Sequence, residues 1–364
     1  MGLRSLGARD FRCFAEVNLE FADSVNVVVG DNASGKTSLL EAIYFLGRGR
    51  SFRESRRRAL IRYGCRELIV FGRVGRGDGA SVRLGLRLEE GAMQGRVARR
   101  KAGGIGELAA WLPVQVIDPH VHRLLEGGPG ERRRYMDWGV FHVEHGYLEA
   151  WRRYARALRQ RNVVLRRGGA QAGRLARAWN GELGASGGDL DRARGRFVAR
   201  VGPHVQEIVN RVLGRDCRVE LRYRRGWSEG VTLERALERQ LAGDVERGHT
   251  GAGPHRAELD IRMEGRPARE WVSRGQGKVV SGALVLAEML AAEAAGRGNG
   301  VLLVDDAGAE LGPAYRDRFW AVLEELPAQK FITGVSRAEL PWRGKRLPGR
   351  MFHVEHGQVR EVVE

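Results

Sequence analysis

The chain has few cysteines, no long apolar run and no apolar leader at its start. Its three cysteines, Cys13, Cys65 and Cys217, lack C-x-x-C spacing, which argues against a disulfide framework and a zinc site, so we expect them to be small core residues. No apolar stretch reaches the roughly 18 residues that a membrane-spanning helix needs, because Glu288 and Glu293 interrupt the best candidate. The first residues also lack the apolar core of a secretory signal. We therefore expect a cytoplasmic protein that does not bind membranes.

Lysine is scarce, although positive charge is abundant. Of the 62 basic residues only five are lysines, and the formal net charge is +17. Basic proteins usually have polyanionic partners, most often nucleic acid. Charge alone does not decide the matter, because a high arginine content also arises from coding bias and isolated basic side chains are commonly solvated.

One of the five lysines lies in a phosphate-binding motif. The apolar segment Val25 to Val29 is a predicted strand that runs directly into G-x-x-x-x-G-K-T, and a helix is predicted from Ser38 to Leu46. The loop glycines let backbone N–H groups turn towards phosphate, Lys36 can reach the β- and γ-phosphates, and the Thr37 hydroxyl can bind Mg²⁺. We therefore predict ATP and Mg²⁺ as ligands. The nucleotide-binding residues predicted in this loop are Gly30, Asp31, Asn32, Ala33, Ser34, Gly35, Lys36, Thr37 and Ser38.

A second group of residues near the C-terminus narrows the class of P-loop protein. The apolar segment Gly300 to Val304 ends in two carboxylates, as a Walker B strand does. Asp305 would hold the water shell of Mg²⁺, and Asp306 would orient or deprotonate an attacking water. Some thirty residues earlier, an S-x-G-Q turn begins a predicted helix whose N-terminus can bind a γ-phosphate. This order is typical of ABC-type ATPases, and the residues predicted to act from the turn are Ser273, Gly275 and Gln276.

The pattern of strands and helices predicts an interrupted ATPase lobe. Strand-like runs at 3–14, 17–21, 68–74 and 81–88 predict an antiparallel subsheet, whereas 300–304 and 331–334 are apolar enough to be central parallel strands. The predicted fold is an α/β ABC-type P-loop ATPase head, with a mixed sheet, flanking helices and an inserted helical lobe, and without a long coiled coil. The predicted segments are 1–105 (ATPase lobe with Walker A), 106–248 (mostly helical lobe) and 249–364 (ATPase lobe with signature and Walker B).

The helix predicted from Gly146 to Arg167 has an apolar stripe and a separate basic face. Arg152, Arg156 and Arg159 share the basic face, which suits a phosphate backbone, but an ordinary solvated face explains it better because one helix offers no base-reading pattern. We assign no DNA contact to it. The predicted apolar stripe is Leu148, Trp151, Ala155, Leu158 and Leu165.

Together these motifs give a chain that resembles the RecF family of bacterial DNA-repair ATPases over nearly its whole length. By that resemblance Arg12 would contact the nucleotide, Gln115 would be the Q-loop residue, and Thr333 would take the position of the usual ABC switch histidine. The implied catalytic residues are Lys36, Gln115, Asp305 and Asp306, and the implied Mg²⁺ ligands are Thr37 and Asp305. The stretches that carry the resemblance are 30–46, 49–53, 112–117, 124–141, 253–256, 273–278 and the segment around 305–306.

The resemblance also implies a function in DNA replication and recombinational repair. It implies an SMC-like head that ATP clamps into a homodimer on double-stranded DNA near single-strand gaps, where it works with RecR and RecO to help load RecA during the SOS response to DNA damage. ATP would act mainly as a switch, and slow, DNA-stimulated hydrolysis would release the clamp.

Three positions depart from the family pattern. Gly312 stands where the D-loop aspartate should follow Glu310-Leu311, and Gly277 replaces the second glutamine of S-R-G-Q-Q-K. Ala33 occupies a loop position often held by glycine, where its methyl fits if φ is negative. We expect ATP binding to survive these changes better than hydrolysis does.

Two other functions stay open. One is an ATP-binding scaffold without significant hydrolysis, which Gly312 favours. The other is a metabolic or nuclease-linked P-loop enzyme whose positive charge is incidental, although the sequence displays neither a clustered metal-binding motif nor an acceptor pocket.

Overall fold

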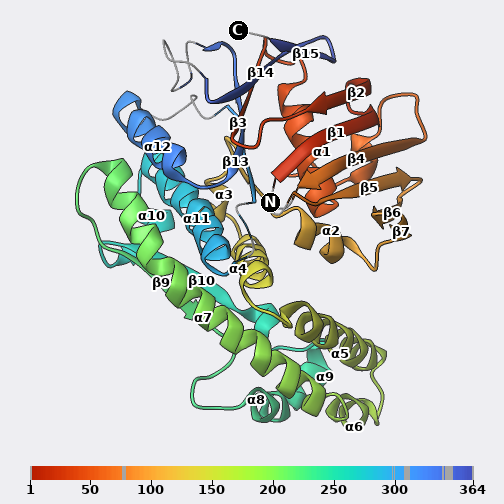
Figure 1. Cartoon of the computed structure of the whole chain (residues 1–364). Coiled ribbons are helices and arrows are strands. Elements are labelled where there is room, and N and C mark those ends of the chain that lie inside the picture. Colours follow the sequence, from red (N-terminus) through yellow and green to blue (C-terminus); the bar gives the residue numbers. More distant parts are fainter. Residues whose placement is uncertain are drawn as a thin grey trace. The chain divides into compact units, whose positions relative to one another are not determined.

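The computed structural model describes residues 2–75, 79–296, 298, 300–306, 312–337, 340 and 347–362 of the chain. Its contacts divide the chain into two units, each built from discontinuous segments (Figure 1). Residues 106–121 belong to the first unit and 249–291 to the second, and the division into segments 1–105, 106–248 and 249–364 stays a prediction. The first unit is Met1–Val121, Arg211–Gly214 and Ala292–Glu364, and the second is His122–Asn210 and Arg215–Ala291.

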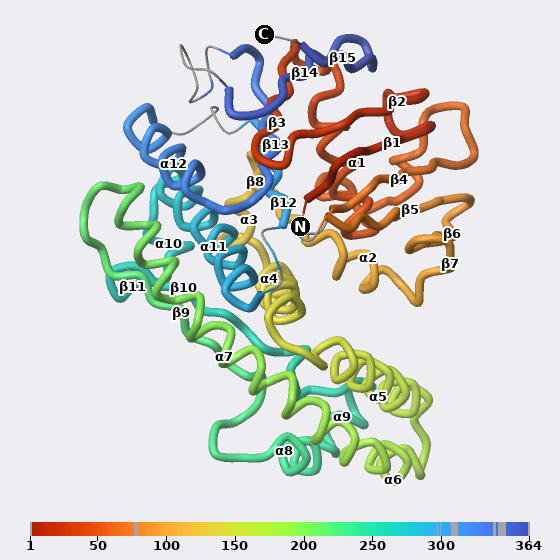
Figure 2. Tube along the Cα trace, in the orientation of Figure 1, coloured from red at the N-terminus to blue at the C-terminus, as the bar shows by residue number. Residues whose placement is uncertain are grey.

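The first unit contains a mixed sheet whose strand order is β15-β14-β3-β13-β12-β8. In Figure 2 the N-terminal strand β3 (Val25–Val29) lies between segments from the far end of the chain, β13 (Gln329–Gly334) and β14 (Gly349–Glu355). These strands and β12 (Val301–Val304) and β8 (Val114–Ile117) run parallel, and β15 (Gln358–Val362) is antiparallel. Every residue of β12 and β13 is buried, which confirms the prediction of central parallel strands.

A second, antiparallel sheet completes this unit, as predicted. Helix α1 (Lys36–Arg48) packs against strands of both sheets and is buried from Leu39 to Gly47. The unit also contains the 3₁₀ helix η1 (Arg57–Leu60) and the helices α2 (Ile105–Trp111) and α12 (Pro313–Glu325). The sheet is β2 (Phe14–Glu20), β1 (Gly2–Phe11), β4 (Glu67–Gly75), β5 (Ser81–Glu89), β6 (Ala92–Val97) and β7 (Arg100–Lys101), in that spatial order.

The second unit is mostly helical but also contains a small sheet. Its longest helix, α7 (Asn180–Leu213), has 34 residues, the last three of which belong to the first unit, and no long coiled coil is present among the described residues. Strand order in the sheet is β11 (Arg266–Pro267), β10 (Glu258–Met263), β9 (Val219–Arg224). The helices are α3 (Arg123–Glu126), α4 (Pro129–Val143), α5 (Tyr147–Arg167), α6 (Ala172–Arg177), α8 (Leu233–Arg239), α9 (Leu241–Arg247), α10 (Ala268–Trp271) and α11 (Arg274–Ala294), with a 3₁₀ turn η2 (Pro254–Arg256).

The prediction that the cysteines are core residues holds for only one of them, and the inward face of α5 is not its apolar stripe alone. Helix α5 forms, but of its predicted apolar stripe only Leu165 is fully buried, and Trp151 is 43% exposed. The face that packs inward includes the charged Arg161, whose burial an apolar pattern does not reveal. Among the cysteines only Cys217 is buried, whereas Cys13 is exposed.

In the described part of the chain, no helix combines the length and the apolar character needed to cross a membrane.

Candidate ATPase site

The loop between β3 and α1 has the backbone conformation of an anion-binding nest. Gly30 and Gly35 have φ values of 152° and 123°, and Ala33 has a φ of 64°. The condition for an unstrained methyl at Ala33, a negative φ, is therefore not met, and the left-handed conformation costs a non-glycine residue roughly 1 kcal/mol. Ser34 has a buried Oγ without a hydrogen-bond partner in the described structure. The loop thus holds polar groups in a geometry that suits phosphate oxygens.

Lys36 folds back over this loop. Its Nζ donates to the carbonyl oxygens of Gly30 at 2.6 Å and Asp31 at 2.8 Å. The ammonium group is therefore at the rim of the nest, where a phosphate would be an alternative acceptor.

Three elements bring Thr37, Asp305 and Thr333 together at the carboxyl end of the parallel strands. Val304 of β12 pairs with Ile332 of β13, so the next residues, Asp305 and Thr333, are neighbours. Thr37 Oγ1 lies 2.9 and 3.0 Å from the two carboxylate oxygens of Asp305, and Thr333 Oγ1 donates to Asp305 Oδ1 at 2.8 Å. Hydroxyl and carboxylate oxygens are the ligands that Mg²⁺ prefers, so Thr37 and Asp305 fit a magnesium ion.

The two adjacent carboxylates have different environments. Asp305 is buried, and burial raises the pKa of its carboxyl, although the hydrogen bonds from Thr333 and Thr37 and the charge of Arg53 act in the opposite direction. Asp306 is exposed, has a φ of 50°, and its backbone N–H donates to Thr333 Oγ1 at 2.8 Å. The arrangement therefore separates a buried carboxyl group, Asp305, from an exposed one, Asp306, next to it.

Arg12 does not contact the loop through any hydrogen bond in the described structure. Its guanidinium makes a bidentate ion pair with the buried Glu41, at 2.7 and 2.8 Å, and donates to the Ala59 carbonyl at 2.8 Å. A nucleotide contact by Arg12 stays a prediction. Sequence reasoning missed Arg53 as a candidate site residue. Its charge acts on Asp305 and lowers the pKa of that carboxyl. The signal was present, because Arg53 is the last residue of the 49–53 stretch that carries the family resemblance.

Gln115 is set back from the carboxyl end of the sheet. It lies inside β8, pairs in register with Leu302 of β12, and is buried. Ile117 is the β8 residue at the level of Val304, so Gln115 lies two positions, or about 7 Å, further from the Asp305 edge. Its Q-loop function stays a prediction.

The signature turn caps helix α11 in the second unit. The Ser273 N–H donates to Gln276 Oε1 at 3.1 Å, and the Gln276 N–H donates to Ser273 Oγ at 3.4 Å. This reciprocal pair is a capping box, and it explains why the helix begins at Arg274, as the sequence predicted.

Packing does not require glycine at positions 277 and 312, which depart from the family pattern. A Cβ on Gly277 would meet Val272 and Leu125 at 3.5 and 3.8 Å, which are ordinary contacts, and a Cβ on Gly312 would meet nothing within 4 Å. Gly312 precedes α12, and Glu310 and Leu311 lie outside the described residues. The first side-chain carbon of a larger residue would therefore fit at both positions.

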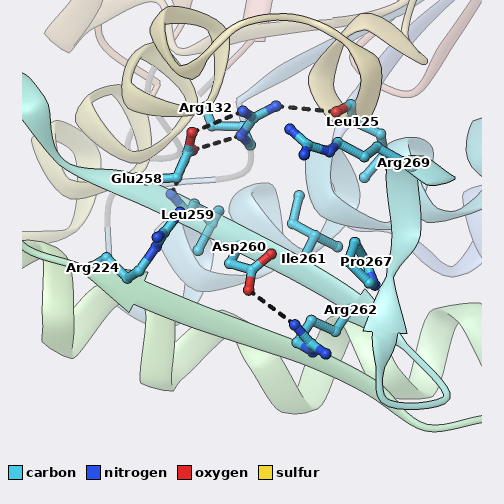
Figure 3. Close-up of a pocket in the computed structure, with 10 residues that line it drawn as sticks. All are labelled: Leu125, Arg132, Arg224, Glu258, Leu259, Asp260, Ile261, Arg262, Pro267 and Arg269. Atoms are coloured by element: carbon cyan, nitrogen blue, oxygen red, sulfur yellow. Dashed lines mark hydrogen bonds and ion pairs between the residues drawn. The ribbon is translucent and has the colours of Figure 1, made fainter.

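The second unit also contains a pocket, and one of the arginines that line it, Arg132, is hydrogen-bonded to neighbouring protein groups (Figure 3). Arg132 makes a bidentate pair with Glu258 at 2.7 and 2.9 Å and donates to the carbonyls of Gly127 and Leu125 at 2.7 and 3.1 Å. This guanidinium ties α4 to β10 and is not available to an added anion. The pocket is lined by Leu125, Arg132, Arg224, Glu258, Leu259, Asp260, Ile261, Arg262, Pro267 and Arg269.

The fold and this site define an ABC-type ATPase head of the SMC kind. The family model for the RecF/RecN/SMC N terminal domain matches residues 2–341. The chain belongs to the RecF family. It is 40% identical over 365 residues to the DNA replication and repair protein RecF of Pseudomonas paraeruginosa (strain DSM 24068 / PA7), with 100% of this chain and 98% of that protein covered. The RecF of Stutzerimonas stutzeri (strain A1501) is equally similar, at 40% identity with the same coverage.

Solved structures agree with this assignment. A structure of the recombination mediator protein RecF with ATP, in the RecFOR pathway, has a TM-score of 0.87 at 25% identity and covers 100% of this chain and 98% of that one. An Smc head bound to the C-winged helix domain of ScpA has a TM-score of 0.61 at 16% identity, covers 100% and 97%, and supports the fold alone.

Proposed function

We propose that the chain binds ATP with Mg²⁺ and uses it as a switch that controls a homodimer on DNA. The observation that carries this proposal is the contact of Thr37 with Asp305, because it joins the phosphate loop to the Walker B strand across 268 positions of the sequence. The similar RecF structure with ATP supports the choice of nucleotide.

Each residue of the loop has a distinct function in this proposal. The N–H groups from Gly30 to Ser38 cradle the phosphates, and Lys36 exchanges its two carbonyl acceptors for phosphate oxygens. Thr37 and Asp305 hold Mg²⁺, which neutralises phosphate charge when it is bound. Asp306 orients or deprotonates the attacking water.

The signature turn acts on the nucleotide of a second copy. At the start of α11, Ser273 and Gln276 hydrogen-bond to each other. The other N–H groups in the first turn of a helix have no acceptor within the helix and need one from elsewhere. A γ-phosphate in the partner's loop is a suitable acceptor. Two such composite sites make dimerisation depend on ATP, and hydrolysis removes the group that joins the copies.

DNA is the polyanion that this switch controls. The net charge of +17 favours it, and the similar proteins are named for DNA replication and repair. We propose double-stranded DNA near gaps as the substrate, with RecO and RecR as partners, because the similar structure belongs to the RecFOR pathway. Hydrolysis is slow in this proposal; an ATP-binding scaffold is the alternative that Gly312 favours.

Replacing Lys36 tests the proposal. Lys36→Ala should lose ATP binding, ATP-induced dimerisation and ATP-dependent retention on DNA, measured by equilibrium nucleotide binding, sedimentation and filter retention. Lys101→Ala, which removes an exposed lysine of the same unit, is the matched control. Normal ATP-induced dimerisation of Lys36→Ala would contradict the proposal. Single-turnover hydrolysis with and without gapped DNA separates the slow ATPase from the scaffold.

A further inference from the structure

In the first unit, exposed arginines lie on both sides of an exposed tyrosine along residues 53–66. Residues 53–66 contain six arginines and a single acidic residue, Glu54. All six arginines are exposed, and among the described residues Arg56 is the one that has a carboxylate within ion-pair distance, Glu54 at 3.8 Å. The other five are Arg53, Arg57, Arg58, Arg62 and Arg66. Unpaired guanidinium groups at this density form a binding surface for phosphates.

Tyr63 is presented by an anchored turn. Cys65 N–H donates to the Arg62 carbonyl at 3.0 Å, and Gly64 has a φ of 83°, which is the geometry of a type II turn with Tyr63 at its tip. The Arg62 N–H donates to the Asp10 carbonyl at 2.9 Å and fixes the turn to the end of β1. The Tyr63 side chain is 101% exposed, so packing in the described structure does not account for an aromatic residue here.

We propose that this surface, made of Arg57, Arg58, Arg62, Arg66 and Tyr63, contacts DNA where a paired strand becomes unpaired. The inference rests on the proposed function, because it takes DNA as the partner. The arginines bind backbone phosphates of either strand form, whereas the tyrosine ring stacks on a base. An unpaired base is available at a gap and not inside a duplex, so the tyrosine supplies the preference for gaps.

The same surface is braced on the helix that follows the phosphate loop. Arg12 links this segment to the helix. Its N–H donates to the Leu60 carbonyl at 2.8 Å, and its guanidinium donates to the Ala59 carbonyl at 2.8 Å. Its bidentate pair with the buried Glu41 then fixes it to α1, five residues after Lys36. The segment that carries the proposed surface and the phosphate loop are therefore both connected to helix α1.

Replacing Tyr63 tests the base contact. The full-length protein with ATP is titrated by fluorescence anisotropy against a gapped duplex and a fully paired duplex of equal length. Tyr63→Ala should weaken binding to the gapped duplex roughly 5- to 100-fold, as expected for one lost stacking contact, and binding to the paired duplex less than about 2-fold. Tyr63→Phe should restore gap binding, since it keeps the ring.

Replacing arginines tests the phosphate contacts. Arg57→Ala/Arg58→Ala/Arg62→Ala should reduce the slope of log affinity against log salt by about 2 to 3 on both DNAs. Arg83→Ala/Arg96→Ala/Arg99→Ala removes the same charge from exposed positions of the same unit and should leave that slope nearly unchanged. Binding of a fluorescent ATP analogue by every variant shows that the fold and the loop are intact.

The outcomes separate this inference from the proposed function. Absence of ATP-dependent DNA binding by the wild-type protein would refute the function itself. Wild-type binding to gapped DNA together with unaltered binding by Tyr63→Ala would overturn the inference alone. Variants that keep full DNA binding but lose a protein partner would also overturn it, because the surface would then be a protein-docking site.

Discussion

Asp305, the proposed Mg²⁺ ligand, illustrates how a residue placed for function can lower stability. Burial raises the pKa of the Asp305 carboxyl in the folded protein, so its ionised form lowers the free energy of unfolding. This loss becomes smaller as the pH falls through the raised pKa. Asp305→Asn removes this cost. We expect it to increase the free energy of unfolding of the nucleotide-free protein at neutral pH, in urea titrations, while it abolishes Mg²⁺-dependent ATP hydrolysis.

Asp306→Asn is the matched control for this prediction. It makes the same chemical change at the neighbouring, exposed carboxylate, so the free energy of unfolding should stay nearly the same. A less stable Asp305→Asn protein would show instead that the hydrogen bonds from Thr37 and Thr333 outweigh the burial of the charge.

At the scale of elements, a buried polar network joins α5 to α9 and to the segment before β10. Arg161 is fully buried and donates to Asp244 and Thr250, each at 2.8 Å. The Thr250 carbonyl can only accept, so His255 Nε2 carries the proton and donates to it at 3.0 Å. His255 Nδ1 then accepts from the Tyr154 hydroxyl at 2.6 Å. Loss of one member leaves a buried polar group without a partner.

His255 makes the second unit sensitive to acid. Burial, reinforced by the charges of Arg256 and Arg133, lowers its pKa from 6.5 to about 4. The unfolded chain then binds more protons between these values, so stability is greatest above pH 6.5 and falls as the pH approaches 4, by up to about 3 kcal/mol. Urea unfolding at pH 7 and pH 4.5 measures this loss. His255→Gln should be less stable at pH 7 but should lose less on acidification, and an equal loss in both proteins would refute the assignment.

The elements show why sequence patterns predicted some features and missed others. The P-loop, the strands β12 and β13 and the start of α11 follow from local signals: a glycine motif, apolar runs and a capping box. The inward face of α5 does not, because the buried Arg161 is paired with Asp244, which is 83 positions away. The pairing of Arg12 with Glu41 was missed for the same reason, since both its partner and the Ala59 carbonyl come from other elements. Non-local ion pairs leave no periodic signal in a sequence.

At the scale of the whole molecule, the two parts of the proposed composite site lie in different units. The phosphate loop and Walker B strand belong to the first unit, and the signature turn belongs to the second. In the proposed function a γ-phosphate shared between two copies would use one part from each, so occupancy of the loop and association of the copies would become one equilibrium. This coupling is the physical content of calling ATP a switch.

Ser273→Arg tests that coupling, because it disrupts the signature turn and leaves the phosphate loop intact. We expect the variant to bind ATP as a monomer and to show no ATP-induced dimer in sedimentation velocity. Thr232→Arg is the matched control, since Thr232 caps α8 in the same unit by accepting from the Arg235 N–H, and its loss costs a comparable ~1 kcal/mol of helix capping. The control should dimerise as the wild-type protein does. A Ser273→Arg protein that sediments as a dimer with ATP would show that the signature turn does not act on the partner's nucleotide.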